Sequence, residues 1–140
     1  MRKMTNYWLC VIDDRNWRIV NRHNIWGVRG RFHNTISGAK VGDRLVFYVK
    51  PLKIGGVFEA TSDPYEDHEL LFGEKGASDL YPFRIRLRKV IIPEEALPFK
   101  QVIPKLEFIK NKRKWGGYLQ GRAMIPISEY DYKIIETALT

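Results

Sequence analysis

Hydrophobic residues in this chain form short runs and alternating patterns, which favour strands over long helices. Residues 7–12 (YWLCVI) and 45–49 (LVFYV) are continuously apolar over the length of a strand. Each is therefore expected to lie in a sheet with both faces covered. In residues 83–88 (FRIRLR) apolar residues alternate with arginines. This alternation predicts a strand with one face on the core and three guanidinium groups on the other face.

The stretch 41–62 (VGDRLVFYVKPLKIGGVFEATS) is expected to carry the central strands. Gly42 and Asp43 are typical of a turn, because glycine tolerates positive φ and an Asp side chain can bond a nearby backbone N–H. Pro51 donates no ladder hydrogen bond, so the first strand should stop before it. Two glycines then restart the chain as a second strand over 57–61. The pattern predicts a hairpin, and we expect a small barrel to be built around it.

Helices are predicted to be short and to lie around this sheet. Asp13 can cap a basic helix over 15–23. Residues 99–108 have the apolar spacing of a short amphipathic helix, interrupted by a proline. Ser128, followed three residues later by Asp131, marks the start of a terminal helix.

Length and composition indicate one globular domain over residues 1–140, with 44% hydrophobic residues and a single cysteine. The apolar runs are far shorter than a membrane span, and the N-terminal residues do not have the pattern of a signal peptide. We therefore expect a cytoplasmic location and no membrane association. The three histidines are widely spaced and have no cysteine partners, so neither a metal site nor a cofactor is predicted.

The net charge of +8 is distributed unevenly along the chain. Residues 1–58 hold 11 Lys/Arg against 3 Asp/Glu, and residues 80–125 hold the same numbers. Residues 59–79 hold 1 against 7. Such segregation predicts a basic face, which attracts phosphate backbones, and a separate acidic loop. The alternative is a protein of high pI without a polyanionic partner.

Three aromatic or basic segments are candidates for binding. Trp26-Gly27 lies outside any periodic pattern and is predicted to line a pocket; alternatively, Trp26 plugs the end of the barrel. Residues 110–118 (KNKRKWGGY) interleave cations with aromatics, as in proteins that bind single-stranded or flipped bases. Their alternative is a solvated loop with one anchoring tryptophan. The arginine row of residues 84–88 suits phosphate contacts, and it equally suits pairing with the acidic loop.

The motifs VGDRLVFY, IGGVFEA and DPYED, in this order and spacing, resemble the EVE domain family. That family belongs to the PUA-like superfamily, together with YTH and ASCH domains, and the resemblance extends from residue 7 to the C-terminal helix. It implies an α+β fold: a PUA-like small twisted β-barrel of five to six strands with short surrounding helices. It also implies a nucleic-acid-binding module that recognises a modified or flipped base in DNA or RNA.

The resemblance and the residue types together suggest which side chains bind. Trp26 is similar to a tryptophan of the YTH aromatic cage, and Asn6 lies near a region that contacts the base edge in YTH domains. Tyr48 is expected to close the pocket floor. Many EVE domains have His-Ser where Val49 and Lys50 stand here, so contacts of that loop are not transferred. The predicted base pocket is Asn6, Trp26, Gly27, Tyr48 and Trp115. The predicted contacts to the nucleic-acid backbone are Arg29, Arg31, Arg84, Arg86, Arg88, Lys110, Lys112, Arg113 and Lys114.

A second function stays open from the sequence. Some ASCH relatives are small hydrolases that use Lys, Thr and Glu near the hairpin. Lys53, Glu59 and Thr61 are residues of those types here. The alternative is therefore an ASCH-like hydrolase acting on a nucleoside-type substrate, although the expectation is a binding module and not an enzyme.

Overall fold

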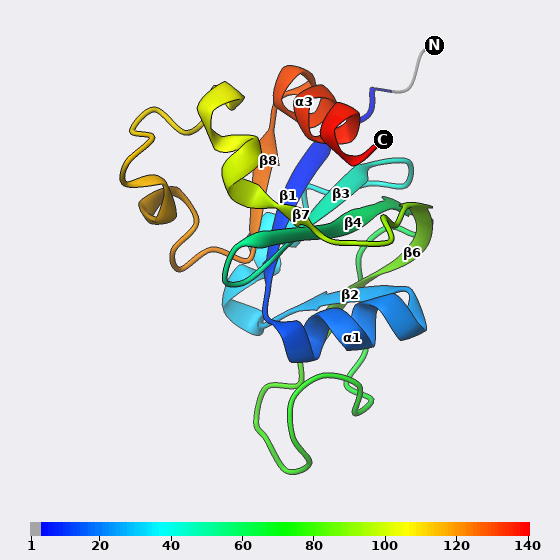
Figure 1. Cartoon of the computed structure of the whole chain (residues 1–140). Helices are drawn as coiled ribbons and strands as arrows, with labels where there is room; N and C mark the ends of the chain where they lie inside the picture. The colour runs from blue at the N-terminus through cyan, green and yellow to red at the C-terminus, as the bar shows by residue number, and fades with distance from the viewer. Residues whose placement is uncertain (1–3) are drawn as a thin grey trace.

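The computed structural model describes residues 4–140, which form a curled sheet surrounded by short helices (Figure 1). The six principal strands are β1 (Tyr7–Ile12), β2 (Ile25–Val28), β3 (Arg44–Val49), β4 (Lys53–Ala60), β6 (Phe83–Ile91) and β8 (Met124–Ile127). Two short strands are β5 (Tyr65–Glu66) and β7 (Leu97–Pro98). The α-helices are α1 (Asp14–His23), α2 (His33–Ile36) and α3 (Glu129–Leu139). Four 3-10 turns complete the order: η1 (Gly30–Phe32), η2 (Phe99–Gln101), η3 (Ile103–Lys105) and η4 (Trp115–Tyr118).

The six strands follow the path β2-β6-β4-β3-β1-β8 and curl into a half-barrel. Strands β1 and β3 pair in parallel, and every other neighbouring pair is antiparallel. The α+β, barrel-like fold with short surrounding helices is therefore confirmed. Within residues 4–140 the two ends of the path, β2 and β8, do not pair with each other. The half-barrel thus has an open seam.

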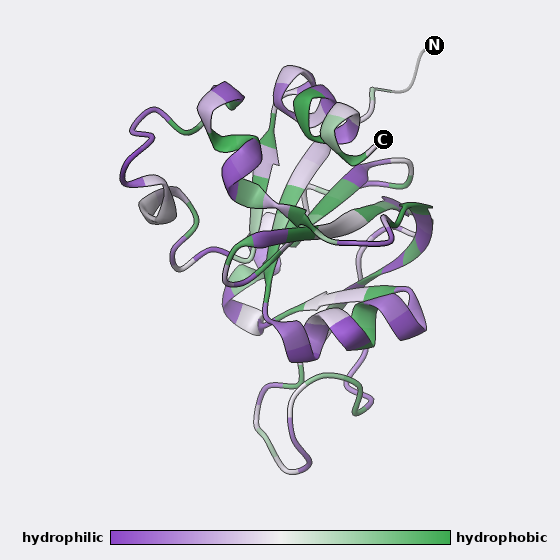
Figure 2. Ribbon diagram, viewed as in Figure 1, coloured by the Kyte–Doolittle hydropathy of each residue, from purple (hydrophilic) through white to green (hydrophobic). Residues whose placement is uncertain are grey.

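Both faces of the sheet are buried, as the continuously apolar strands predicted. In β3, Leu45 and Phe47 belong to a core cluster on one face, which also holds Trp26 and Phe58. Val46, next along the strand, belongs to a second cluster with residues of η2, η3 and α3. The strands are correspondingly apolar in Figure 2, whereas α1 shows polar residues along much of its length. Burial on both faces fixes β3 and β4 at the centre of the sheet.

Strand β4 begins at Lys53, four residues earlier than the sequence pattern indicated, and it includes both glycines. The glycines let neighbouring groups approach the strand closely. A Cβ at Gly55 would lie 2.6 Å from the Trp17 ring, and one at Gly56 would lie 2.7 Å from the Ile91 carbonyl oxygen. These residues therefore serve close packing and do not interrupt the strand.

The two predicted helix caps are confirmed. The Asp13 side chain accepts a hydrogen bond from the backbone N–H of Asn16 at 2.7 Å. The Ser128 hydroxyl accepts one from the N–H of Asp131 at 3.1 Å. The amphipathic helix predicted over 99–108 is wrong, because this segment forms the separate turns η2 and η3, with Pro104 in the second. Proline supplies no N–H for a continuous helix. No helix in residues 4–140 is long and apolar enough to cross a membrane.

Candidate nucleic-acid interface

A cavity of about 750 Å³ lies beside the open seam of the half-barrel. Its walls come from five parts of the chain: the end of β1 with the start of α1, strand β2 with the following loop, the β3–β4 turn, Tyr81, and residues 115–123. The last of these segments leads into β8, so the cavity occupies the space between β2 and the β1–β8 pair. A volume of this size is typical of sites for small organic ligands, which are about 300–1,000 Å³.

The deep wall of the cavity is aromatic and largely buried. Trp26 is only 4% exposed and packs edge-on against Phe47, with ring centroids 5.4 Å apart. Its Nε1–H is buried and has no hydrogen-bond partner among residues 4–140. The Tyr48 hydroxyl donates to the carbonyl oxygen of Pro51 at 2.5 Å, which fixes that ring below Trp115 at a centroid distance of 6.3 Å. Trp26 thus lines the cavity and also fills the core, which combines the two roles considered from the sequence.

Three aromatic side chains that line the cavity are only partly buried, namely Phe32, Tyr81 and Trp115. Trp115 packs edge-on against Phe99 at 5.5 Å. Tyr81 has a φ of 57°, a left-handed conformation that is uncommon for a residue with a side chain. Because these rings are not fully buried, they leave aromatic surface in the cavity for a ligand.

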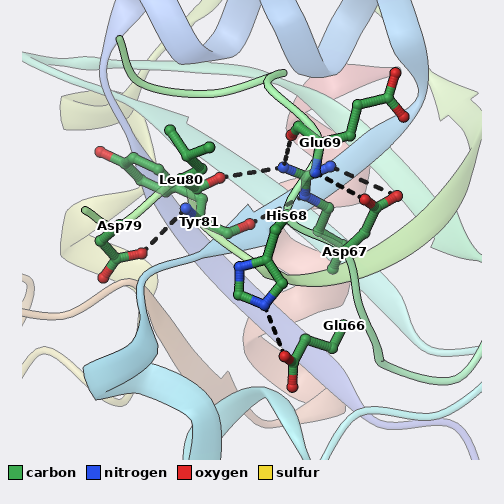
Figure 3. Close-up of polar contacts among 8 residues, drawn as sticks. Glu66, Asp67, His68, Glu69, Asp79, Leu80 and Tyr81 are labelled. Atoms are coloured by element: carbon green, nitrogen blue, oxygen red, sulfur yellow. Dashed lines mark hydrogen bonds and ion pairs between the residues drawn. The ribbon is translucent and has the colours of Figure 1, made fainter. Parts of the chain in front are cut away.

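Hydrogen bonds from the acidic loop hold Tyr81 in place (Figure 3). The Asp79 carboxylate accepts from the Tyr81 N–H at 3.1 Å, and its other oxygen accepts from the Gly30 N–H at 3.1 Å. From the opposite side, the Arg84 guanidinium donates to the carbonyl oxygens of Glu69, Leu80 and Tyr81 at 2.6, 3.1 and 3.1 Å. The loop that carries Tyr81 is therefore tied to β6 and to the loop after β2.

The rim of the cavity is positively charged. Arg29, Arg31, Lys50 and Arg122 line it and are exposed, whereas Asp13 is the only acid of the described residues that lines it. None of the four cations forms an ion pair within residues 4–140, although six cations elsewhere are paired with carboxylates. A rim with unpaired cations around aromatic surfaces is suited to an anionic ligand that also has a flat ring.

Two rim cations lie over aromatic rings of the cavity lining, and one of them is Arg31, whose guanidinium carbon is 4.6 Å from the centroid of the Phe32 ring. The Arg29 guanidinium carbon lies 5.1 Å from the centroid of the Tyr81 ring. Hydrogen bonding of the guanidinium to the Tyr81 side chain and charge interaction with it, followed by the charges of Asp79 and Asp13, raise the pKa of Arg29. This guanidinium is consequently charged at every physiological pH and is held over the ring.

The structure brings together six of the residues predicted from the sequence: Trp26, Gly27, Tyr48, Trp115, Arg29 and Arg31 all line the cavity. Asn6 lies before the other end of β1, where its N–H donates to Asp43, and it does not line the cavity. Gly27 is required by close packing, because a Cβ there would lie 2.8 Å from the Phe72 ring.

The arginine row on β6 does not form the uniform exposed face that the alternation predicted. Arg84 is 2% exposed because the acidic loop covers it, so this part of the prediction is wrong. Arg86 lies over the Tyr65 ring and Arg88 donates to Glu59 at 2.9 Å. The alternative considered for this row, pairing with the acidic loop, describes Arg84, which lies 3.8 Å from the Asp67 carboxylate, whereas Arg88 pairs with Glu59 of β4. None of the three lines the cavity.

The cationic segment 110–114 lies next to the cavity. Lys112 and Arg113 line a smaller cleft that adjoins it through Trp115, whereas Lys110 and Lys114 are exposed outside both.

Sequence reasoning missed several residues that line the cavity: Asp13, Asn16, Lys50, Tyr81, Gln120 and Arg122. For Gln120 and Arg122 a signal was present, since they flank Gly121, whose φ of 73° forms a tight turn before β8. Tyr81 had no comparable signal, because its position depends on how the acidic loop folds back onto the loop after β2, through the hydrogen bond from the Gly30 N–H to Asp79.

The residue types of the hydrolase alternative do not converge. Lys53 begins β4, where its backbone pairs with Pro98 of β7. Glu59 lies near the other end of the strand and forms ion pairs with Arg44 and Arg88. Neither they nor Thr61 line the cavity. Within residues 4–140, no cluster of three His, Cys, Asp or Glu side chains is placed to hold a metal ion.

The fold and the site together define a small α+β domain whose open half-barrel holds an aromatic cavity with a cationic rim. The sequence matches the EVE domain model over residues 6–138, and the chain belongs to the EVE domain family. It is 45% identical to a UPF0310 protein of Pyrococcus abyssi, over 96% of this chain and 99% of that protein.

Two solved structures illustrate how widely this fold occurs. A hypothetical protein from Leishmania major superposes with a TM-score of 0.68 at 20% identity, covering 96% of this chain and 94% of its own. The YTH domain of the Zygosaccharomyces rouxii MRB1 protein, solved in complex with N6-methyladenosine RNA, superposes with a TM-score of 0.66 at 15% identity. This alignment covers 100% of this chain and 91% of the YTH chain.

Proposed function

We propose that this domain binds nucleic acid and takes one unstacked, modified base into the cavity beside the seam. The observation that carries the proposal is the combination of partly exposed aromatic rings with unpaired rim cations around about 750 Å³ of space. A base has a flat ring that stacks on aromatic side chains, and its backbone carries the phosphates that guanidinium groups bind. The fold likeness to a YTH domain bound to N6-methyladenosine RNA supports this class of ligand.

In the proposed complex each part of the cavity has a separate task. Tyr81 and Trp115 stack on the base, and Trp26 forms the buried wall behind it. Arg29, Arg31 and the other rim cations hold phosphates next to the extruded nucleotide. Removing the base from a stack costs a few kcal/mol, and this cost is lowest in a single strand. We therefore expect single-stranded ligands to bind more tightly than duplexes.

The test is a binding screen against DNA and RNA oligonucleotides, single- and double-stranded, with and without modified bases. One stacking contact is worth about 1–3 kcal/mol, so Tyr81→Ala should weaken binding of the preferred oligonucleotide about 5- to 150-fold. Tyr130→Ala is the matched control, since this tyrosine is 57% exposed on α3 and does not line the cavity. Equal affinity of the two variants for every oligonucleotide would refute the base pocket.

The rim is tested separately by salt. If Arg29 and Arg31 contact phosphates, the logarithm of the binding constant should fall linearly with the logarithm of salt concentration. Replacing both with glutamine should lower that slope by about one for each phosphate that is no longer bound. An unchanged slope would show that these cations belong to a solvated surface.

The proposal is for a binding module, and turnover tests the alternative directly. Incubation with oligonucleotides and acylated nucleosides, with or without divalent metal ions, should return them unchanged. Turnover that disappears in Lys53→Ala would overturn the proposal in favour of the ASCH-like hydrolase.

A further inference from the structure

A second, smaller cleft of about 250 Å³ adjoins the cavity, and Trp115 is part of the lining of both. One side of this cleft is formed by residues around η2 and η3, namely Lys100, Ile103 and Pro104. The other side is formed by Lys112, Arg113 and Trp115. Its lining thus combines three cations and one aromatic ring with two apolar residues, and it contains no acid.

The three cations of the cleft have no acidic partner. Lys100, Lys112 and Arg113 form no ion pair in the part of the chain that the structure describes. The Lys112 ammonium donates to the carbonyl oxygen of Leu106, which holds it in place without neutralising it. Unpaired like charges repel one another, so their convergence is unfavourable unless an anion binds between them.

The segment that carries these cations is held in a defined conformation. The Asn111 side chain accepts hydrogen bonds from the N–H groups of Arg113 and Lys114, both at 3.2 Å. The N–H of Asn111 donates to the Tyr118 hydroxyl at 2.9 Å. Where the segment begins, the buried Asp131 carboxylate accepts from the N–H groups of Glu107 and Phe108 at 2.7 and 3.1 Å. A cationic segment fixed in this way loses little conformational entropy when it binds an anion.

We infer that the cleft binds the phosphate of the nucleotide adjacent to the one whose base enters the cavity, so that the strand passes over Trp115. This inference rests on the proposed function. The cleft has about one third of the cavity's volume, which suits a phosphodiester group better than a second base in its own pocket. Since Trp115 lines both sites, one strand can occupy the cavity and the cleft together. A short single-stranded segment should therefore bind more tightly than a free nucleoside, which occupies the cavity alone.

The decisive comparison uses two double variants with the same change in charge. Lys100→Gln with Arg113→Gln removes two cations of the cleft, whereas Lys40→Gln with Lys105→Gln removes two exposed cations elsewhere that line neither site. The probes are N6-methyladenosine, the single-stranded pentanucleotides of adenosine and deoxyadenosine, and the adenosine pentanucleotide with a central N6-methyladenosine. Affinities are measured by calorimetry at several salt concentrations, starting at low salt.

We expect the cleft variant to bind all three pentanucleotides about tenfold more weakly, with unchanged affinity for the nucleoside. Its salt slope should fall by about 0.7 for each phosphate of the single strand that the cleft no longer binds. The control variant should change affinity less than about twofold, because distant surface charges are screened. Equal losses in both variants would overturn the cleft inference and leave the cavity intact, provided that Tyr81→Ala still weakens binding. No pentanucleotide binding at low salt would overturn both proposals.

Discussion

Replacing Arg84 with methionine should destabilise the domain far more than the same change at Arg86, two residues along the same strand. Arg84 is 2% exposed and donates hydrogen bonds to the backbone carbonyl oxygens of Glu69, Leu80 and Tyr81, all in the segment before β6. Each carbonyl left without a partner costs about 1 kcal/mol, so the three together cost about 3 kcal/mol. The ion pair with Asp67 adds little, because its atoms are 3.8 Å apart and Asp67 is 40% exposed.

One effect opposes this loss. Methionine removes the desolvation cost of a buried guanidinium, which places the expected decrease in unfolding free energy at about 2–3 kcal/mol. Arg86 is exposed and contacts only the Tyr65 ring through its guanidinium, at 5.5 Å, which is worth about 0.5 kcal/mol. Urea unfolding measures both variants, and a slope of about 2 kcal/mol/M translates the Arg84 effect into a midpoint lowered by about 1 M. If the two midpoints agree, the loop is not anchored by Arg84.

Three further predictions concern packing and pH. Gly27→Ala should lower the unfolding free energy by about 1–3 kcal/mol through overpacking against Phe72, whereas Gly116→Ala, whose Cβ would meet nothing within 4 Å, should change it little. Trp26→Ala should lower it by about 3–5 kcal/mol, because the ring is 4% exposed in the core. Burial raises the pKa of the Cys10 thiol well above its ordinary value. The folded state therefore keeps a proton that the unfolded chain releases, and stability should fall as pH rises above about 8.5, an effect that Cys10→Ala should remove.

The same urea titration, repeated across pH for the cysteine variant, checks all three. A Gly27→Ala protein as stable as Gly116→Ala would mean that Phe72 and the acidic loop that carries it move aside for the added methyl group without loss of stability. A Trp26→Ala protein of near-normal stability would return this side chain to a purely ligand-binding role. Parallel pH profiles with and without Cys10 would show that the thiol titrates alike in both states.

Most of the sheet was predictable because its signals are local. The β3–β4 hairpin, the runs that became β1 and β3, and the caps at Asp13 and Ser128 each depend on a few consecutive residues. Strand β2 was not foreseen, because its four residues acquire their pairing only when β6 lies beside them. The amphipathic spacing over 99–108 misled for a similar reason, since apolar spacing alone does not show where a proline divides a helix into separate turns.

The candidate site was predictable only in part, because the topology assembles it from distant segments. Trp26 and Trp115 were visible as aromatics beside glycines, a local signal, and both line the cavity. Tyr81 was missed because only the return of the acidic loop brings it there, and Arg122 was missed although it follows the turn glycine Gly121. Arg84 shows the limit most plainly. Strand alternation places it outward with Arg86, but a loop that the pattern does not describe folds over it and buries it.

The walls of the cavity come from almost the whole length of the chain, from Val11 to Ala123, and they meet only when the last strand has joined β1. Neither half of the chain alone supplies all of these walls. A ligand of this cavity must bind the folded state alone, which couples its affinity to the global unfolding equilibrium. At a concentration about 100 times its dissociation constant, such a ligand adds about 2.7 kcal/mol to the folded state. For a domain of this size the melting temperature would rise by several degrees. A thermal-shift survey of nucleosides and oligonucleotides can thus find the natural ligand without any prior assumption about which base it carries.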